Sequence, residues 1–413
     1  MAGRGTPEAA GSRVAGTRRL GYAPEVVFNP LAPSQVGAAA ANVWDAAING
    51  GLADTRPQAR RILTEARHRT LYRYLETTDP VPERLPVLLV PTLGAPPSCF
   101  DLRHGNSLVE HLLGSGARTY MVDFGRQRFS DRDLALERWV ELVLPRTIKE
   151  ASRDAGDRPL HLVGWSLGGV LAALTVANDQ SLPVHTISVV AAPFDMHRMR
   201  LRATLAPLSA INALSEGFIQ AALTRLIANP AAAPFVRTGM RALTLPQELR
   251  YPTALAMNLH DREALAQLEA TEAIKRELRT YSGRSIGQIY ARFIAVNELD
   301  VRPAELHGEF LDLGALRQPF LSIAGTDDIL APEMAVHAVS TMLPQSAEVR
   351  LRTAPGGHIA VLAGPNAKAT TWKELDEFQG WWDTRQIRKR VPSRRVSVEE
   401  AGATIERPKL HVL

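Results

Sequence analysis

The residues best placed to do chemistry are a serine and the two glycines beside it. Gly164, Ser166 and Gly168 form a Gly-x-Ser-x-Gly pattern, which follows an apolar run typical of a strand and precedes an apolar segment typical of a helix. On so tight a strand-to-helix turn the serine hydroxyl points out of the sheet edge, and the first amides of the helix face negative charge that develops there. We therefore expect Ser166 to be a nucleophile; the alternative is a glycine-rich packing turn.

An activated serine needs a base, and it needs an acid that orients the base. In a parallel α/β architecture with this turn, the acid follows the serine in the chain and the histidine comes last. Asp327 and Asp328 lie at the end of a predicted strand, in the segment Gly325-Thr-Asp-Asp-Ile-Leu-Ala-Pro332. We favour Asp328 as the acid because of its place in the loop, and we interpret Asp327 as a capping or turn aspartate.

The candidate base is a histidine in a glycine-rich loop. Among eleven histidines, His358 stands after the last predicted strand in Ala354-Pro-Gly-Gly-His358, where paired glycines let the backbone turn and present the ring. We expect His358 to be the general base. His197 follows the end of another predicted strand and is kept as a candidate for substrate contact.

Acyl transfer also needs two backbone donors for the oxyanion. One should be the N–H of Leu167, directly after the nucleophile, and the other should come from the loop after the first core strand, Pro91-Thr-Leu-Gly94. Pro91 has no N–H. We favour Leu93, with Thr92 as the alternative.

The single cysteine, Cys99, is either a second nucleophile or a small apolar residue, and we favour the apolar interpretation. One cysteine excludes an intramolecular disulfide framework and a multi-cysteine zinc site. The sequence also lacks H-E-x-x-H, a P-loop and a G-x-G-x-x-G turn. We therefore expect neither a metal nor a cofactor.

The elements that must position these residues alternate between strands and helices. Such alternation predicts βαβ units, and hence a mostly parallel, doubly wound α/β sheet. Helical patterns cover 35–77, including one predicted helix over 57–75. The stretch from about 196 to 310 also has a helical pattern, without obvious strands. We interpret it as a cap over the carboxyl edge of the sheet. The predicted strands are 86–91, 118–123, 160–164, 184–192, 318–325 and 348–352.

Composition and charge suggest how the chain is divided. Of 413 residues, 45% are apolar and 22% charged, as in a globular protein, and the net charge of +5 comes from basic ends: the body from 21 to 383 carries −3. The expected parts are a disordered basic tail over 1–20, an N-terminal helical segment over 21–80, a core over 81–195 and 311–383, a helical cap over 196–310 and a basic C-terminal tail over 384–413.

The basic C-terminal tail is either solvated or in contact with anionic lipid or a granule; we do not expect nucleic acid binding. No stretch of 18 consecutive apolar residues and no apolar secretory leader occur in the sequence. We therefore expect a cytoplasmic protein, peripheral to lipid or polyester inclusions.

The motifs follow one another in an order that is similar to that of a known family. The chain resembles polyhydroxyalkanoate synthases and their α/β-hydrolase relatives across roughly residues 60–383. This resemblance implies an α/β-hydrolase core with a helical cap, and acyl transfer through a triad of Ser166, Asp328 and His358. The matching segments are Leu88-Leu-Val-Pro91, Asp101-Leu102 with Ser107-Leu-Val-Glu110, Tyr120-Met-Val-Asp-Phe-Gly125, Gly164-Trp-Ser-Leu-Gly-Gly169, Asp328-Ile-Leu-Ala-Pro332 and Pro355-Gly-Gly-His358.

The synthases carry cysteine where this chain carries Ser166. A thioester passes on its acyl group readily because a thiolate leaves easily, whereas a serine ester is less activated and favours water as the acceptor. We therefore expect a serine hydrolase of a lipophilic carboxylic ester or thioester, of lipase, esterase or polyester depolymerase type. The alternatives are an acyltransferase or polyester synthase that uses a hydroxyacyl-CoA, and a non-catalytic protein that binds lipid or polyester granules.

Overall fold

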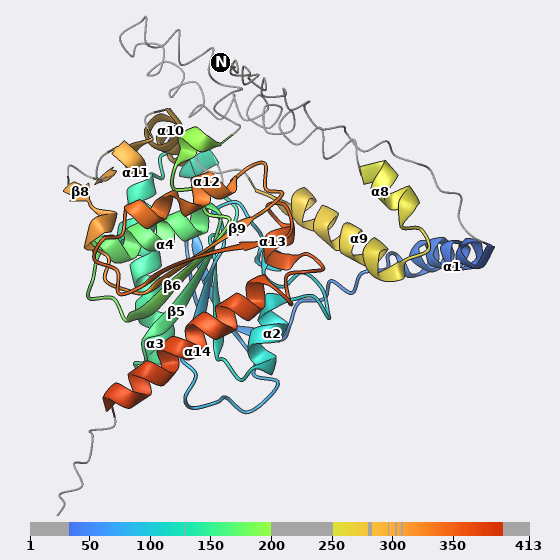
Figure 1. Ribbon diagram of the computed structural model, residues 1–413, viewed down its shortest axis with the longest axis horizontal. Helices are drawn as coiled ribbons and strands as arrows, with labels where there is room; N and C mark the ends of the chain where they lie inside the picture. The colour runs from blue at the N-terminus through green and yellow to red at the C-terminus, as the bar shows by residue number, and fades with distance from the viewer. Residues whose placement is uncertain are drawn as a thin grey trace, which may run out of the picture.

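The chain folds around one large sheet. The computed structural model describes residues 33–127, 129–199, 251–279, 283–295, 297–301, 304–306 and 309–390 of the 413. Within these residues, the main sheet has eight strands in the order β1-β2-β4-β3-β5-β6-β9-β10 (Figure 1). Their bounds are β1 Arg60–Ala66, β2 Arg69–Tyr74, β3 Val87–Val90, β4 Thr119–Asp123, β5 Leu160–Trp165, β6 Val184–Val190, β9 Phe320–Gly325 and β10 Val349–Ala354.

The strands from β4 to β10 in this order all run parallel, whereas the β1–β2 hairpin lies antiparallel to β4 at one edge. Each apolar run that predicted a strand coincides with one of the parallel strands. The mostly parallel, doubly wound sheet is therefore confirmed.

Helices connect the strands and cover both faces of the sheet (Figure 1). None of the helices in the described ranges is long and apolar enough to cross a membrane. The α-helices are α1 Pro33–Asn49, α2 Leu108–Gly114, α3 Leu144–Asp154, α4 Leu167–Asn178, α8 Tyr251–Met257, α9 Arg262–Glu277, α10 Gly283–Gln288, α11 Glu298–Val301, α12 Glu333–Val336, α13 Ala360–Ala363 and α14 Thr371–Arg390. The 3₁₀ and π turns are η1 Pro97–Cys99, η2 Phe129–Asp131, η3 Arg138–Val143, η4 Met196–Arg198, η6 Ile289–Ala295, η7 Leu313–Ala315 and η8 His337–Thr341.

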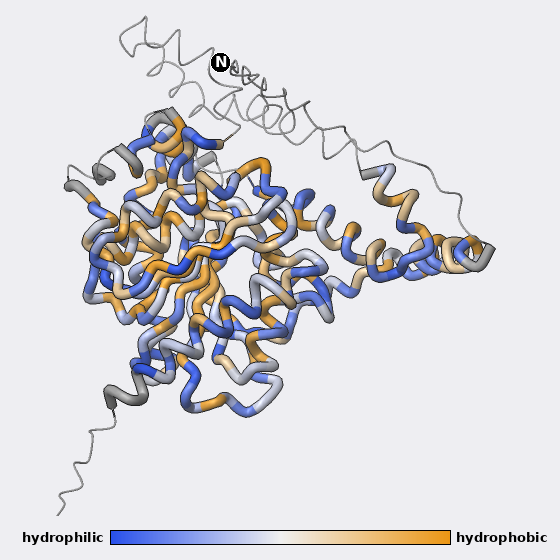
Figure 2. Tube along the Cα trace, viewed as in Figure 1, coloured by the Kyte–Doolittle hydropathy of each residue, from blue (hydrophilic) through white to orange (hydrophobic). Residues whose placement is uncertain are grey.

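Alternate residues of each central strand enter two different cores. Leu88 and Val90 of β3 belong to the core that contains α3 and α4, while Val87 and Leu89 belong to the core that contains α2 and α14. Successive side chains of a strand point to opposite faces, and all four of these residues are fully buried. The central strands are accordingly apolar along their length (Figure 2), which is why unbroken apolar runs revealed them.

A hairpin replaces the helix expected over 57–75, so the helical interpretation of 21–80 is wrong there. β1 and β2 pair antiparallel, and β2 continues the sheet beside β4. The apolar residues of this stretch do not form one buried helical face: Ile62 is 54% exposed, whereas Leu71 and Tyr74 of β2 are fully buried. α1 is helical, as expected of that part of the region.

Contacts far apart in sequence hold this hairpin. Arg69 donates to both carboxylate oxygens of Glu150 in α3, at 2.6 and 3.0 Å, and Arg73 donates to Asp154 at 3.1 Å. Burial by itself would raise the pKa of Glu150, but the hydrogen bonds from Arg69 and Thr64 lower it. Ion pairs between segments so far apart leave no local signal in the sequence. The spacing of apolar residues therefore cannot reveal a hairpin that depends on them.

The chain between β6 and β9 forms an insertion, to which α8, α9, α10 and α11 belong. A short antiparallel pair, β7 Ala304–Leu306 with β8 Glu309–Leu311, closes it, so the expectation of a region without strands is wrong at this end. Strands of three residues are too short to produce a readable alternation. Residues 200–250 lie outside the described residues, and the division into core and cap stays a prediction.

α14 carries the chain past the core boundary expected at 383. The helix extends to Arg390, so residues 384–390 of the expected basic tail are helical, and residues 391–413 lie outside the described residues. The Arg385 guanidinium carbon lies 4.8 Å from the centroid of the Trp381 ring and 5.2 Å from that of Trp382. These contacts join neighbouring turns of the helix beyond the boundary that the charge distribution suggested.

Two histidine–aspartate pairs fix α14 to the rest of the core. The ring of His161, in β5, lies 2.9 Å from Asp383 Oδ1 through Nε2 and 2.7 Å from Thr186 Oγ1 through Nδ1. His111, in α2, approaches Asp376 Oδ2 at 2.6 Å. Burial by itself would raise the pKa of Asp376, but the hydrogen bond from His111 lowers it.

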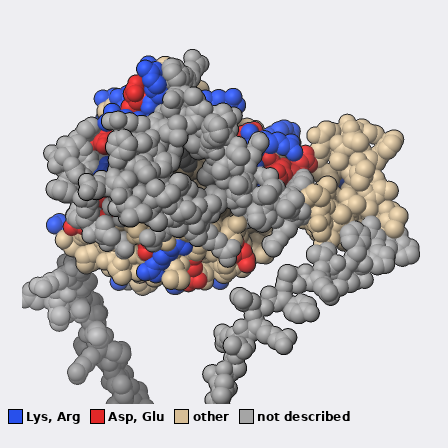
Figure 3. Space-filling model, turned by 90° about the horizontal axis from the view of Figure 1, so that it is seen from above, with Lys and Arg blue, Asp and Glu red and all other residues tan. Residues whose placement is uncertain are grey.

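α1 lies beside the α8–α9 segment, to the side of the sheet (Figure 1), where Asn42 Nδ2 donates to the Leu259 carbonyl at 3.0 Å. The part of the molecule that projects on the right of Figure 3 is drawn almost wholly in tan, so it shows few charged residues on this face. Large apolar side chains that gather on a surface are typical of interaction sites. On α1 they are Val36, Val43, Trp44 and Ile48, which are 53%, 54%, 70% and 62% exposed.

We expect Asp383→Ala to lower the free energy of unfolding by about 3 kcal/mol, because it leaves Nε2 of the buried His161 ring without its partner. Urea unfolding followed by circular dichroism measures this change. Glu377→Ala is the matched control on the same helix, since Glu377 is exposed and lies 3.7 Å from Lys373. This control should cost less than about 0.5 kcal/mol, and equal losses would contradict the anchoring role of Asp383.

Candidate active site

The turn between β5 and α4 presents Ser166. Its backbone has φ 54° and ψ −132°, in a region that residues with a side chain rarely adopt. The Ser166 N–H donates to the Val190 carbonyl at 2.9 Å, and the Gly169 N–H donates to the Ser166 carbonyl at 3.0 Å. These bonds hold the strained turn, which places the serine at the N-terminus of α4.

Close packing of backbone against backbone explains the glycines of the motif. A Cβ on Gly164 would lie 2.4 Å from the Gly169 Cα, and a Cβ on Gly168 would lie 2.3 Å from the Pro91 carbonyl oxygen. No side chain fits at either position. The first turn of α4 therefore touches the end of β3, where the loop 91–94 begins.

Three segments bring the candidate triad together at the carboxyl edge of the sheet. His358 Nε2 lies 2.9 Å from Ser166 Oγ, and His358 Nδ1 lies 2.8 Å from Asp328 Oδ2. Ser166 follows β5, Asp328 follows β9 and His358 follows β10, so the parallel order of the strands puts all three at one edge. The result is a continuous chain of hydrogen bonds from hydroxyl to imidazole to carboxylate.

The surroundings of Asp328 hold its carboxylate in a fixed orientation. Its side chain is fully buried, and Oδ1 accepts the N–H groups of Leu330 and Ala331, both at 2.9 Å. These two donors leave Oδ2 for His358. A carboxylate held by backbone donors keeps its orientation and so fixes the ring that it faces.

Asp327 lies in the neighbouring turn and contacts the histidine loop instead of the ring. Its Oδ2 accepts the Gly356 N–H at 3.3 Å, and its own N–H donates to the Gly356 carbonyl at 3.2 Å. The two adjacent aspartates thus meet different partners: Asp328 meets the imidazole, and Asp327 meets the backbone that carries it.

The two expected oxyanion donors belong to two segments of backbone that contact each other. Leu167 begins α4, and Leu93 lies in the loop after β3 that Gly168 touches. Within the described residues neither N–H donates a hydrogen bond to another residue. Their role as donors to an oxyanion stays a prediction.

Comparison with known proteins identifies the fold family of the chain. A family model described as the alpha/beta hydrolase fold matches residues 86–365. The chain belongs to the α/β-hydrolase fold family. Its sequence is similar to poly(3-hydroxyalkanoate) polymerase subunits, which supports the resemblance to polyhydroxyalkanoate synthases.

The similarity to these relatives is distant. The subunit from Synechocystis sp. is 26% identical over 70% of this chain and 76% of its own length. The subunit from Haloarcula marismortui is 22% identical over 75% of this chain and 63% of its own length, so the match leaves about a third of it uncovered. The solved structure of a thermophilic esterase from Thermogutta terrifontis is 15% identical, covers 78% of this chain and 99% of its own, and has a TM-score of 0.41.

Two other candidates from the sequence, Cys99 and His197, are not members of the hydrogen-bonded triad. Cys99 is buried in an apolar cluster, and burial raises the pKa of its thiol, so its environment suits packing and not nucleophilic attack. His197 lies in η4, where its N–H donates to Asp195 at 3.0 Å, and its contact with substrate stays a prediction. No group of three metal-ligating side chains occurs within the described ranges.

Two residues near the site, Arg279 and Trp165, were not predicted from the sequence. Arg279, from the insertion, donates its backbone N–H to the Gly94 carbonyl and its guanidinium to Asp123 at the end of β4, both at 2.7 Å. Trp165, inside the serine motif itself, donates its indole N–H to the carbonyl of His358 at 3.0 Å. Neither residue type has a fixed place in a motif, so only the fold reveals these contacts.

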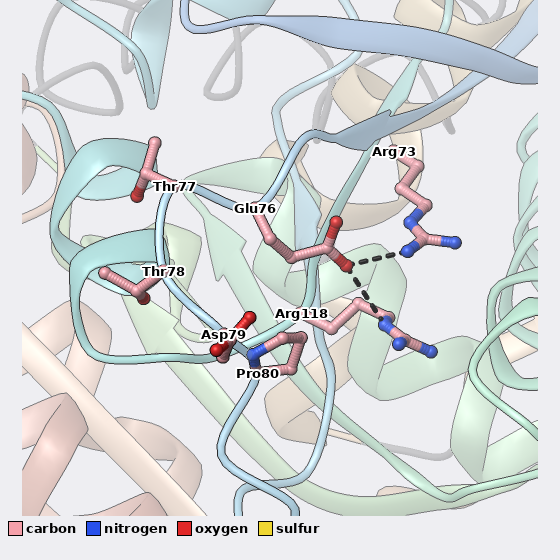
Figure 4. Close-up of a pocket in the computed structure, with 7 residues that line it drawn as sticks. All are labelled: Arg73, Glu76, Thr77, Thr78, Asp79, Pro80 and Arg118. Carbon is pink, nitrogen blue, oxygen red and sulfur yellow. Dashed lines mark hydrogen bonds and ion pairs between the residues drawn. The ribbon is translucent and has the colours of Figure 1, made fainter.

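A surface cavity of about 630 Å³ lies away from this site (Figure 4). Arg118 precedes β4, so the cavity opens at the amino edge of the sheet, opposite the edge of the triad. Figure 4 shows Glu76 between Arg73 and Arg118, and the carboxylate pairs with both guanidinium groups, at 2.7 and 3.3 Å. Internal pairing satisfies these charges, and the cavity adds nothing to the triad.

We expect Gly168→Ala to lower the free energy of unfolding by about 2 kcal/mol or more, because its methyl group meets the Pro91 carbonyl oxygen. Thermal and urea unfolding measure the loss. Gly380→Ala, in α14, is the control: no atom lies within 4 Å of the added Cβ, and alanine favours the helix, so stability should stay equal or rise by up to about 1 kcal/mol. A Gly168→Ala protein as stable as the control would contradict the packing argument.

Proposed function

We propose that this α/β hydrolase is a serine esterase or lipase that cleaves a lipophilic carboxylic ester or thioester through an acyl-serine intermediate. The hydrogen-bonded chain from Ser166 through His358 to Asp328, on a strained strand-to-helix turn, is the observation that supports this proposal most directly. Such a chain lets a neutral hydroxyl lose its proton as it attacks a carbonyl carbon.

In the first half of the reaction, Ser166 Oγ bonds to the acyl carbonyl carbon while His358 Nε2 takes the hydroxyl proton. Asp328 holds the proton on His358 Nδ1 and stabilises the imidazolium that forms. The carbonyl oxygen becomes an oxyanion, which the Leu167 and Leu93 N–H groups bind. The bond to the leaving group then breaks, the leaving alcohol or thiol takes the proton from His358 Nε2, and Ser166 stays acylated.

In the second half, water replaces the leaving group. His358 Nε2 takes a proton from the water as its oxygen attacks the acyl carbon, and the same two N–H groups bind the new oxyanion. The bond between the acyl carbon and Ser166 Oγ breaks, and the proton on His358 returns to that oxygen. The products are the free acid and the regenerated serine.

The substrate class follows from sequence and similarity together. The region expected to cap the site is rich in alanine, leucine and methionine, which suits a lipophilic acyl chain better than a peptide or a sugar. Met257, at the end of α8, is 51% exposed. Six more large apolar residues of this region lie outside the described residues: Leu205, Leu208, Ile211, Leu214, Phe218 and Ile219.

The second candidate function keeps the site and changes the acceptor. Similarity to polymerase subunits favours an acyltransferase that takes a hydroxyacyl group from coenzyme A and passes it to an alcohol. The serine at position 166 argues against this reaction as the main one, because an oxygen ester is a poorer acyl donor than a thioester. The acceptor of the acyl group decides between the two functions.

We expect purified protein to release free acid from a medium-chain acyl ester or a hydroxyacyl-CoA, and Ser166→Ala to lower kcat by at least about 10⁴-fold. Chromatography of the products gives the acceptor. Serine-dependent polymer or transferred ester would favour the acyltransferase. Activity retained in Ser166→Ala, or a folded protein that a fluorophosphonate does not label, would contradict both and favour a non-catalytic role.

We expect the two neighbouring aspartates to differ sharply in their effect on rate. Asp328→Asn should lower kcat by about 10³- to 10⁴-fold, because the amide no longer favours the productive tautomer of His358. Asp327→Asn is the matched control, since its side-chain oxygen can still accept the Gly356 N–H, and kcat should stay within about tenfold of wild type. Equal losses, or a greater loss in Asp327→Asn, would contradict the assignment of the acid.

A further inference from the structure

Trp165 is the residue between Gly164 and the candidate nucleophile, and it ends β5. Its side chain is almost wholly buried, at 3% exposure, within the core that contains α14. A tryptophan at this position could be a packing residue alone. Its polar contact points to a more specific role, because a buried indole N–H must find an acceptor, and the acceptor here is the carbonyl of His358.

Two contacts join Trp165 to the candidate base. The indole Nε1–H donates to the His358 carbonyl oxygen at 3.0 Å. The indole and imidazole rings lie with their centroids 5.4 Å apart and their planes at 41°. Backbone and ring of one histidine are thus both held by the residue that precedes the serine.

The opposite side of the histidine loop is held by the acid's neighbour. Asp327 bonds to Gly356 through its carboxylate and through its backbone N–H, at 3.3 and 3.2 Å. Gly356 has φ 120°, a conformation that residues with a side chain rarely adopt. The loop is therefore positioned from two sides, by the turn after β9 and by the last residue of β5.

We propose that Trp165 is a positioning residue, which sets the distance between the base and the nucleophile by fixing the His358 backbone to the same strand end that carries Ser166. This inference rests on the proposed function. Trp165 and Ser166 are covalently joined, so a shift of the turn moves the nucleophile and the anchor of the base together. The 2.9 Å contact between Ser166 Oγ and His358 Nε2 is then preserved as the turn moves.

The chain offers a close control for this proposal. Trp372, at the start of α14, is also buried, and its indole N–H donates to the Leu362 carbonyl at 2.8 Å. Replacing either tryptophan by phenylalanine removes one buried indole-to-carbonyl hydrogen bond. Only the change at position 165 removes a bond to the candidate base.

The experiment compares Trp165→Phe with Trp372→Phe in steady-state hydrolysis, after unfolding curves show that both are folded. We expect Trp165→Phe to lower kcat by about 10- to 100-fold with KM within about twofold, because a base displaced by a fraction of an ångström still allows substrate to bind. Trp372→Phe should keep kcat within about twofold. Trp165→Tyr, which keeps a ring but has no donor at the indole nitrogen position, should behave as Trp165→Phe and replaces it if that variant does not fold.

A kcat within about twofold of wild type in the folded Trp165 variant would overturn the proposal, as would equal losses at the two positions. The rate of Ser166 labelling by a fluorophosphonate separates this result from the proposed function. If wild type is labelled but hydrolyses no ester, the proposed function fails, and a slower labelling rate in Trp165→Phe alone still supports positioning. Labelling of Ser166 at equal rates in wild type and in both variants would overturn the positioning role of Trp165.

Discussion

The close approach of two backbones at Gly168 is the constraint on which the rest of the site depends. A side chain at this position would collide with the carbonyl of Pro91, so α4 can begin directly beside the end of β3 only because the residue is glycine. That contact brings the first amide of α4 and the loop after β3 to one place. It also fixes the turn in which Ser166 takes its strained conformation, since the neighbouring backbone bonds leave no room for relaxation.

Strand order does the rest of the assembly. Ser166, Asp328 and His358 are far apart in the sequence, yet each follows a parallel strand, and parallel strands end at a common edge. β6 lies between β5 and β9, so the acid and the base reach the serine from strands on one side of it. The loops that carry the acid and the base are short and are held by backbone hydrogen bonds, which fixes the geometry of the triad.

The insertion between β6 and β9 is tied to the core near the site. Arg279 joins it to the loop after β3 through the Gly94 carbonyl, and to the end of β4 through Asp123. That loop contains Leu93, so the insertion contacts the segment of backbone that is expected to bind the oxyanion.

The sequence by itself determined the parallel core and the serine turn. Strands buried on both faces must be apolar along their length, and a turn packed backbone to backbone must be glycine, so both leave local signals at β3 and at Gly164. The order of the motifs also placed Ser166, Asp328 and His358. Only the tertiary structure decided the rest: the β1–β2 hairpin depends on Arg69 and carboxylates of α3, and the contact of Trp165 with His358 joins residues 193 apart. Such contacts form between surfaces that exist only after folding, so no local pattern encodes them.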